Sequence, residues 1–144
     1  MNSVDVVGLG SCTVDFFALV PNLIGGEEKI NVNRLEVHAG GVTANNLTQV
    51  ARLGASAGWF GLIGDDANGR IILDAFIADH MDTSAVERVQ GGLSSMTWIP
   101  VDARGERCIY MFPNITATVT SDQIRSRFAP YIRQAKHFHT EASQ

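Results

Sequence analysis

The chain has 144 residues, which fits one compact domain with a core large enough to fold without disulfide bonds. Hydrophobic residues make up 45% of the chain and charged residues 18%, a globular composition that excludes a mainly disordered protein. The formal net charge is −4 and the basic residues are scattered, so we expect no binding of nucleic acid or of an anionic membrane.

The sequence predicts three extended segments in the first 37 residues. Residues 4–10 form a nearly unbroken apolar run that ends at glycine, which predicts a buried strand of the parallel type. Residues 15–20 are extended up to Pro21. Residues 27–37 alternate between apolar and polar side chains, which predicts a half-exposed antiparallel ribbon with an irregular middle.

After Gly40-Gly41 the apolar residues recur at helical spacing up to Ala51, and Gly54 is placed as the C-terminal cap. Residues 56–63 predict one buried strand, and the turn at residues 64–69 leads into a helix that extends through Phe76. Residues 95–101 and 107–112 predict a hairpin around the turn at residues 102–105.

The last segment predicts a helix from Ser121 to about Gln134, interrupted at Pro130, and then a strand over residues 135–141. Strands that alternate with helices predict an α/β sheet covered by helices on both faces. A parallel strand normally lies inside a sheet, yet the sequence stops three residues after Glu141. We therefore expect a chain that is cut rather than finished.

Two local patterns could carry chemistry. Asp15 follows the first strand, where open α/β sheets bind ligands, and its carboxylate could accept hydrogen bonds from neighbouring hydroxyls. Gly40-Gly41 would let the main chain touch a ligand at a helix start, where Asn45 offers both a donor and an acceptor. A solvated strand end and an ordinary loop-to-helix turn are the alternative interpretations.

Other motifs are weaker. Gly8-Leu9-Gly10 lacks the third glycine of a dinucleotide fingerprint, since position 13 is Thr, so an oxidoreductase is a distant possibility. His137 and His139 share one face of a strand, but no further cluster of metal ligands accompanies them. Asp65-Asp66 could bind magnesium or could equally cap a helix. No metal site is therefore assigned.

Four segments together resemble the amino-terminal half of the ribokinase-like, phosphofructokinase-B-type carbohydrate kinases. The resemblance covers essentially the whole chain, and its quoted segments are Val7-Gly8-Leu9-Gly10-Ser11 with Asp15, Ala39-Gly40-Gly41-Val42-Thr43-Ala44-Asn45, Ala51-Arg52-Leu53-Gly54, and Phe60-Gly61-Leu62-Ile63-Gly64-Asp65-Asp66 with Gly69. The resemblance implies a three-layer α/β/α fold with a small β lid, here a partial kinase domain over residues 1–144 with lid segments at approximately 15–38 and 94–113.

The same resemblance implies that the enzyme phosphorylates a sugar or nucleoside hydroxyl with ATP and a divalent cation such as Mg²⁺. By position, Asp15 resembles the family's acceptor for sugar hydroxyls, Gly41 its backbone contact and Asn45 its side-chain contact. Glu141 matches, less closely, a further polar contact near the sugar. Met111 or Phe112 could pack on the sugar, or could equally belong to the core.

The family's catalytic base lies in an Asp-Thr-x-Gly-Ala-Gly-Asp segment, and nothing in this sequence matches it. We therefore expect no catalytic residue in this chain, which would be the substrate-binding half of a sugar kinase without its catalytic half. A carbohydrate is favoured over a nucleoside. The alternatives are a non-catalytic sugar-binding or interaction module and a fragment of a nucleoside kinase.

Cellular context and assembly follow from two further observations. Cys12 and Cys108 lie in different surroundings and form no disulfide framework, and no signal peptide or membrane span is readable, so we expect a cytoplasmic protein. Family members often pair through their lids, which makes a homodimer through the lid a further expectation.

Overall fold

The computed structural model describes residues 4–141. Its central sheet has the order β4-β1-β9, in which β1 (Val6–Leu9) lies between β4 (Ala57–Trp59) and β9 (His137–Thr140). Both pairings are parallel. β5 (Gly61–Gly64) comes directly after β4 in the chain and forms a second parallel pair with β6 (Val86–Val89).

The single strand predicted over residues 56–63 is wrong, because the chain changes its pairing partner at Phe60. Trp59 and Phe60 are adjacent and both fully buried, and their rings enter opposite cores, against Phe76 and Phe128 respectively. Gly61 adopts φ +147, and a Cβ there would come within 2.6 Å of the Trp59 ring. A glycine at this break therefore lets both aromatic rings be buried.

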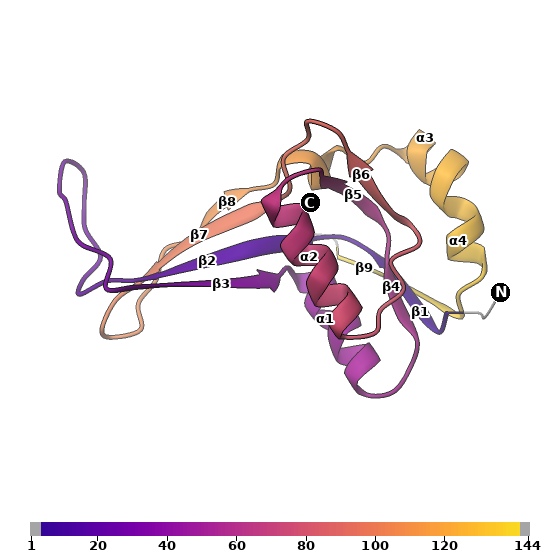
Figure 1. Ribbon diagram of the computed structural model, residues 1–144, viewed down its shortest axis with the longest axis horizontal. Coiled ribbons are helices and arrows are strands. Elements are labelled where there is room, and N and C mark those ends of the chain that lie inside the picture. Colours follow the sequence, from indigo (N-terminus) through magenta and orange to yellow (C-terminus); the bar gives the residue numbers. More distant parts are fainter. Residues whose placement is uncertain (1–3, 142–144) are drawn as a thin grey trace.

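Helices cover both faces of the sheet, which confirms the predicted α/β/α class (Figure 1). On one face lie α1 (Val42–Arg52) and α2 (Ala67–Ala78), and on the other the helical segment formed by α3 (Ser121–Gln123), a turn over Ile124–Phe128 and α4 (Ala129–Arg133). Each face has its own core, one around Val14, Leu47, Trp59, Ile72 and Phe76 and one around Val7, Phe60, Leu62 and Phe128.

The last helical segment begins at Ser121, as predicted. Thr120 is its N-cap, in a reciprocal capping box with Gln123. The expected interruption lies just ahead of Pro130, where Ile124–Phe128 forms a wider π-type turn. Proline donates no backbone hydrogen bond and crowds the carbonyl of the preceding turn, so widening the helix at this point relieves the clash.

A second sheet projects away from this body, at the left of Figure 1, and is called the projecting sheet. Its order is β3-β2-β7-β8, with β3 (Arg34–Gly40), β2 (Thr13–Leu19), β7 (Met96–Val101) and β8 (Tyr110–Phe112). The predicted ribbon over residues 27–37 is a strand only from Arg34, since residues 27–33 have no strand partner. The hairpin is formed, with a shorter second strand and a bridge between Val101 and Arg107. A short 3₁₀ helix, Asn114–Thr118, follows β8.

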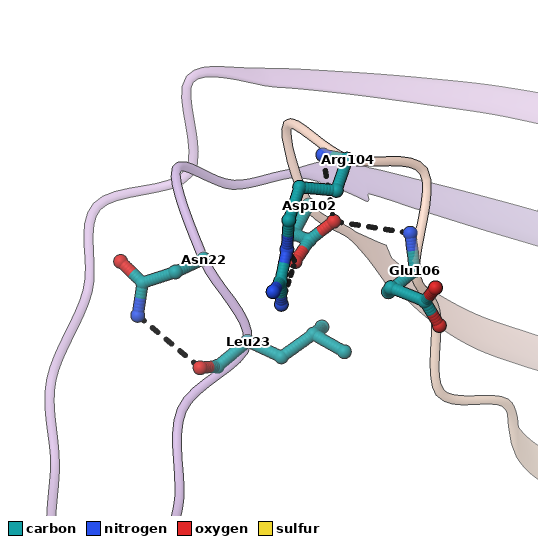
Figure 2. Close-up of polar contacts among 5 residues, drawn as sticks. All are labelled: Asn22, Leu23, Asp102, Arg104 and Glu106. Carbon is teal, nitrogen blue, oxygen red and sulfur yellow. Dashed lines mark hydrogen bonds and ion pairs between the residues drawn. The ribbon is translucent and has the colours of Figure 1, made fainter.

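The hairpin turn between β7 and β8 is organised by one buried carboxylate. Asp102 accepts hydrogen bonds from the backbone N–H groups of Arg104, at 2.8 Å, and of Glu106, at 3.0 Å (Figure 2). The Arg104 guanidinium donates two more, at 3.1 and 3.0 Å. Burial alone would raise the pKa of Asp102, but these hydrogen bonds outweigh burial and hold the pKa below its usual value. The turn is therefore closed by its own side chains.

The projecting sheet has two faces, as the period of two requires. We call inner face the side that carries Thr13, Asp15, Thr97, Ile99, Arg107, Ile109 and Met111, all of which line one cavity. We call outer face the side that carries Ala18, Trp98, Pro100, Cys108 and Tyr110, which line another. Strand register agrees with this division, since Asp15 lies opposite Thr97, and Trp98 lies opposite Tyr110.

Candidate functional site

A cavity of about 440 Å³ lies where the inner face of the projecting sheet meets the first turn of α1. Three of the four residues predicted from the sequence line it, namely Asp15, Gly41 and Asn45. Its other walls come from the segment before β2 and from the hairpin, through Ser11, Cys12, Thr13, Val42, Ser95, Met96, Thr97, Ile99, Arg107, Ile109, Met111, Phe112 and Pro113. The cavity is therefore polar at the root of the projecting sheet, near Asp15 and Thr97, and mainly apolar farther along the hairpin, apart from Arg107.

The Asp15 carboxylate is held at the polar end by its neighbours. Thr97, directly opposite on β7, donates its hydroxyl to Asp15 Oδ1 at 2.6 Å. Gly40 leaves room for the other oxygen, because a Cβ at Gly40 would approach Asp15 Oδ2 to 2.2 Å. A short bond to a charged acceptor and a tight backbone wall fix the carboxylate in one orientation.

The first turn of α1 meets the cavity through Gly41 and Asn45. Gly41 adopts φ +100, and a Cβ there would come within 2.5 Å of the Ser11 carbonyl oxygen. Ser11 also binds the helix start, since its side-chain oxygen accepts from Val42 N–H at 2.7 Å and its carbonyl accepts from Ala44 N–H at 3.1 Å. Within residues 4–141, the Asn45 side-chain amide makes no hydrogen bond with the protein.

Glu141 contacts Ser11, which lines the cavity. Glu141 itself is not among the residues that line the cavity, and it accepts a hydrogen bond from Ser11 N–H. Ser11 thus joins the end of β9, the start of α1 and the start of β2. The structure places Glu141 in contact with this loop, and a direct sugar contact of Glu141 stays a prediction.

Sequence reasoning missed several residues of the cavity, among them Thr13, Thr97 and Arg107. Thr13 is 8% exposed and lines the cavity, and its buried hydroxyl has no hydrogen-bond partner within the described chain. Thr97 and Arg107 enter from the hairpin. The alternation of the hairpin could have placed Thr97 and Arg107 on the same face, but only the pairing of β7 with β2 identifies that face as the one beside Asp15.

Cys12 also borders the cavity but offers no nucleophile. Its thiol is fully buried, and burial, with a smaller contribution from the negative charge of Asp15, raises its pKa far above the usual range. The neutral thiol therefore serves as a small apolar side chain in the core shared with Val14 and Leu47.

The paired acidic residues after β5 have separate structural roles. Asp66 caps α2, accepting from Gly69 N–H at 2.8 Å and from the Ser94 hydroxyl at 2.7 Å, while Asp65 pairs with Arg88. His139 lies within 3.2 Å of the Asn46 amide nitrogen. Over residues 4–141 no three His, Cys, Asp or Glu side chains gather closely enough to hold a metal ion.

The outer face of the projecting sheet carries a second cavity, of about 460 Å³. None of the residues that line it is charged, and the larger ones are Leu23, Ile24, Ile30, Trp98, Tyr110 and Phe112. Several of these side chains are strongly exposed, Tyr110 to 55%. This face is therefore an exposed apolar surface on the opposite side of the sheet from Asp15, and Phe112 borders both cavities.

A helix that crosses a bilayer must be both long and apolar. In residues 4–141 no helix has both the length and the apolar composition that crossing a bilayer requires.

Comparison with known proteins gives a consistent match. The family model described as pfkB family carbohydrate kinase matches residues 3–143. A ribokinase of Staphylococcus aureus is 30% identical over 120 residues, which are 83% of this chain and 40% of that protein. The crystal structure of a ribokinase from Cryptococcus neoformans in complex with ADP is 27% identical, with a TM-score of 0.68 over 78% of this chain and 35% of that one.

A structure of Arabidopsis thaliana ribokinase complexed with ribose and ATP shares the fold, with a TM-score of 0.81 and 20% identity. It aligns with 97% of this chain, which in turn covers 46% of the Arabidopsis protein. The chain thus spans less than half the length of each of these relatives.

Proposed function

Because the chain belongs to the pfkB family of carbohydrate kinases, we propose that it forms the sugar-binding part of an ATP-dependent kinase that phosphorylates a sugar hydroxyl. The observation that supports this most directly is the Asp15 carboxylate, fixed by Thr97 and Gly40 at the polar end of a cavity. A carboxylate in this position accepts charge-assisted hydrogen bonds from two neighbouring hydroxyls of a sugar.

The remaining polar groups supply complementary contacts. Asn45 adds an amide that has no hydrogen-bond partner among residues 4–141, and Gly41 brings main-chain atoms against the ligand. A sugar hydroxyl would satisfy the orphaned hydroxyl of Thr13, which otherwise costs free energy as a buried polar group. Glu141 acts through Ser11, whose position it sets from the end of β9.

The apolar wall formed by Ile99, Ile109, Met111 and Phe112 suits the carbon skeleton of a sugar, and its three exposed side chains, Ile109, Met111 and Phe112, offer apolar surface that a bound sugar could cover. Such a wall beside the sugar works as a lid, which is the role we assign to the projecting sheet. A carbohydrate fits this small, one-sided arrangement of hydroxyl partners better than a nucleoside, and we propose a pentose or hexose skeleton.

Phosphoryl transfer needs an oriented nucleophile, a base and neutralised phosphate charge. The 144 residues contain no Gly-Ala-Gly-Asp segment, and the described residues bring no set of carboxylates together that would hold Mg²⁺. We therefore assign the catalytic base and the site for ATP and Mg²⁺ to sequence outside this chain, which spans 40% of the S. aureus ribokinase. The chain alone is then expected to bind a sugar without phosphorylating it.

Two further parts of the proposal concern its surroundings. The uncharged outer face of the projecting sheet is covered by the same face of a second copy, which gives a homodimer. The protein works in the cytoplasm, where a free thiol such as the exposed Cys108 stays reduced.

The test is calorimetric titration of the purified chain with D-ribose, D-fructose, D-glucose and adenosine, repeated on Asp15→Asn. Removing the charged acceptor is expected to weaken sugar binding by roughly ten- to a hundredfold, the equivalent of about 1.5–3 kcal/mol. The matched control is Asp74→Asn, a change at an exposed position of α2 outside the cavity, which should leave binding unchanged. Failure of all three sugars to bind, tighter binding of adenosine, or equal affinities in Asp15→Asn and the unmodified chain would contradict the proposal.

A further inference from the structure

Arg107 is the second charged residue of the cavity that holds Asp15. In the described part of the chain, the lining of this cavity contains one acidic side chain, Asp15, and one basic side chain, Arg107. Arg107 lies on the inner face of the projecting sheet, in step with Ile109 and Met111. The cavity thus combines a fixed negative charge with a positive charge from another strand.

The Arg107 guanidinium has no partner within residues 4–141, where it forms neither an ion pair nor a hydrogen bond. Arg104, three residues earlier in the same hairpin, is by contrast fully engaged by Asp102 (Figure 2). Asp102 is therefore not available to Arg107. Within the described residues, Arg104 thus binds the turn, whereas Arg107 lies beside the cavity without a partner.

The strand register sets the separation of the two charges. Thr97, which binds Asp15, lies opposite Met111, whereas Arg107 lies opposite Val101. Thr97 and Val101 are four residues apart on β7, which corresponds to about 13 Å along the strand. The two charged side chains therefore enter the cavity from well-separated positions, with apolar side chains between them.

We propose that the substrate of this site carries an anionic group, a carboxylate or a phosphate, at the end remote from the hydroxyls held by Asp15, and that Arg107 binds that group. The inference rests on the proposed function and narrows its substrate class to acidic or phosphorylated sugars. The guanidinium fork matches the two oxygens of either group, and Ile99, Ile109 and Met111 offer apolar contacts to the part of the ligand between its two ends.

The negative net charge of the chain makes Arg107 important for the binding of an anionic ligand. The chain has a formal net charge of −4, and Asp15 adds a negative charge inside the cavity itself. An anionic substrate is repelled by both unless a cation lies at its charged end. Arg107 is therefore expected to determine whether the cavity prefers an acidic sugar or its neutral counterpart.

The test compares matched ligands that differ in one group. D-Gluconate and D-glucitol probe a carboxylate, and D-glucose 6-phosphate and D-glucose probe a phosphate, by calorimetric titration of the full chain at low and at moderate salt. In at least one pair, the anionic ligand should bind ten times more tightly or better, and added salt should reduce the difference. Arg107→Gln should remove the preference, with a much larger loss of affinity for the anionic ligand than for the neutral one, while Arg107→Lys should retain part of the preference.

Arg133→Gln is the charge-matched control, since Arg133 is exposed on α4, which lies outside both the cavity and the projecting sheet. Equal affinities for both members of each pair, or a preference that survives in Arg107→Gln, would overturn the proposal. Equal losses for neutral and anionic ligands in Arg107→Gln would also overturn it, since they indicate a structural role. Asp15→Asn separates the two proposals, because it should weaken neutral and anionic ligands alike. Neutral ligands that depend on Asp15 but show no effect of Arg107 would leave the sugar site intact and remove only the anionic substrate.

Discussion

Thr97 determines the orientation of Asp15, so its hydroxyl should matter for binding although it lies behind the carboxylate. Thr97→Val keeps the shape of the side chain and removes the donor at 2.6 Å. We expect sugar affinity to fall about tenfold, the effect of one hydrogen bond to a charged group. Thr97→Ser, which retains the hydroxyl, should restore most of the affinity. Titration of both variants measures this, and similar affinities for Val and Ser would show that the contact does not position Asp15.

Individual site residues differ in how far the sequence reveals them. Gly41 and Asn45 belong to a local pattern, a glycine pair before a helix, whereas Asp15, placed after the first strand, lies inside β2 and was singled out mainly by the family resemblance. Thr97 could not, since it is 82 residues from Asp15 and reaches it only through the parallel pairing of β2 with β7. A local sequence pattern contains no information about which distant strands pair with each other. Arg107 was missed for the same reason.

At the scale of elements, the cap of α2 connects helix stability to pH. Burial alone would raise the pKa of Asp66, but hydrogen bonds from Ser94 and Gly69 outweigh it and lower the pKa below the ordinary value of 3.8. A lowered pKa means that this group stabilises the fold fully above pH 3.8, and that the contribution is lost as the pH falls through the lower, folded value. Acid should therefore loosen the β5–α2 turn.

The corresponding prediction concerns Asp66→Asn, which keeps a side chain able to cap the helix and removes the titrating group. The free energy of unfolding should be lower than in the unmodified chain at neutral pH, and should fall less steeply below pH 3.8. Urea denaturation at a series of pH values measures both effects. Asp74→Asn, at an exposed position of the same helix, is the control. Parallel pH curves for Asp66→Asn and the unmodified chain would contradict the assignment.

The elements themselves show where periodicity is sufficient and where it is not. The helix after Gly41 and the strand before Gly10 were predicted well, because one face or the whole segment is apolar. The break at Phe60 was not visible, since Trp59 and Phe60 are both apolar and belong to two different cores. Short β6 was missed because two of its four residues, Glu87 and Arg88, are charged.

At the scale of the whole molecule, the outer face of the projecting sheet decides the assembly. Its cavity is lined without a charged residue, so two copies can bury this face against each other without leaving an unpaired charge. Exposed apolar side chains extend it along β3, where Leu35 and Val37 lie opposite Ala18 and Phe16. An exposed apolar patch of this kind typically marks an interface.

We therefore expect the purified chain to sediment as a dimer at micromolar concentration, and Tyr110→Asp to sediment as a monomer. The substitution places a charge among the uncharged residues of this face, where the dimer would bury it without a partner. Leu53→Asp is the matched control, because Leu53 is 78% exposed at the end of α1, away from this face. A monomeric unmodified chain, or a dimer in both variants, would show that this surface is not self-complementary.

The contact between Ser11 and Glu141 has a consequence for the order of events during synthesis. These two residues are 130 positions apart, and they lie just beyond the ends of β1 and β9. At the beginning of the same two strands, Lys136 donates a hydrogen bond to Asp5. The loop that carries Gly41 and the start of α1 is thus anchored by a residue that leaves the ribosome long after them. Because closing so long a stretch of chain is slow, the helices and hairpin can form early, whereas the cavity acquires its final shape only when β9 pairs with β1. A nascent chain that stops short of β9 would contain Asp15 and Asn45 without the arrangement that joins them into one site.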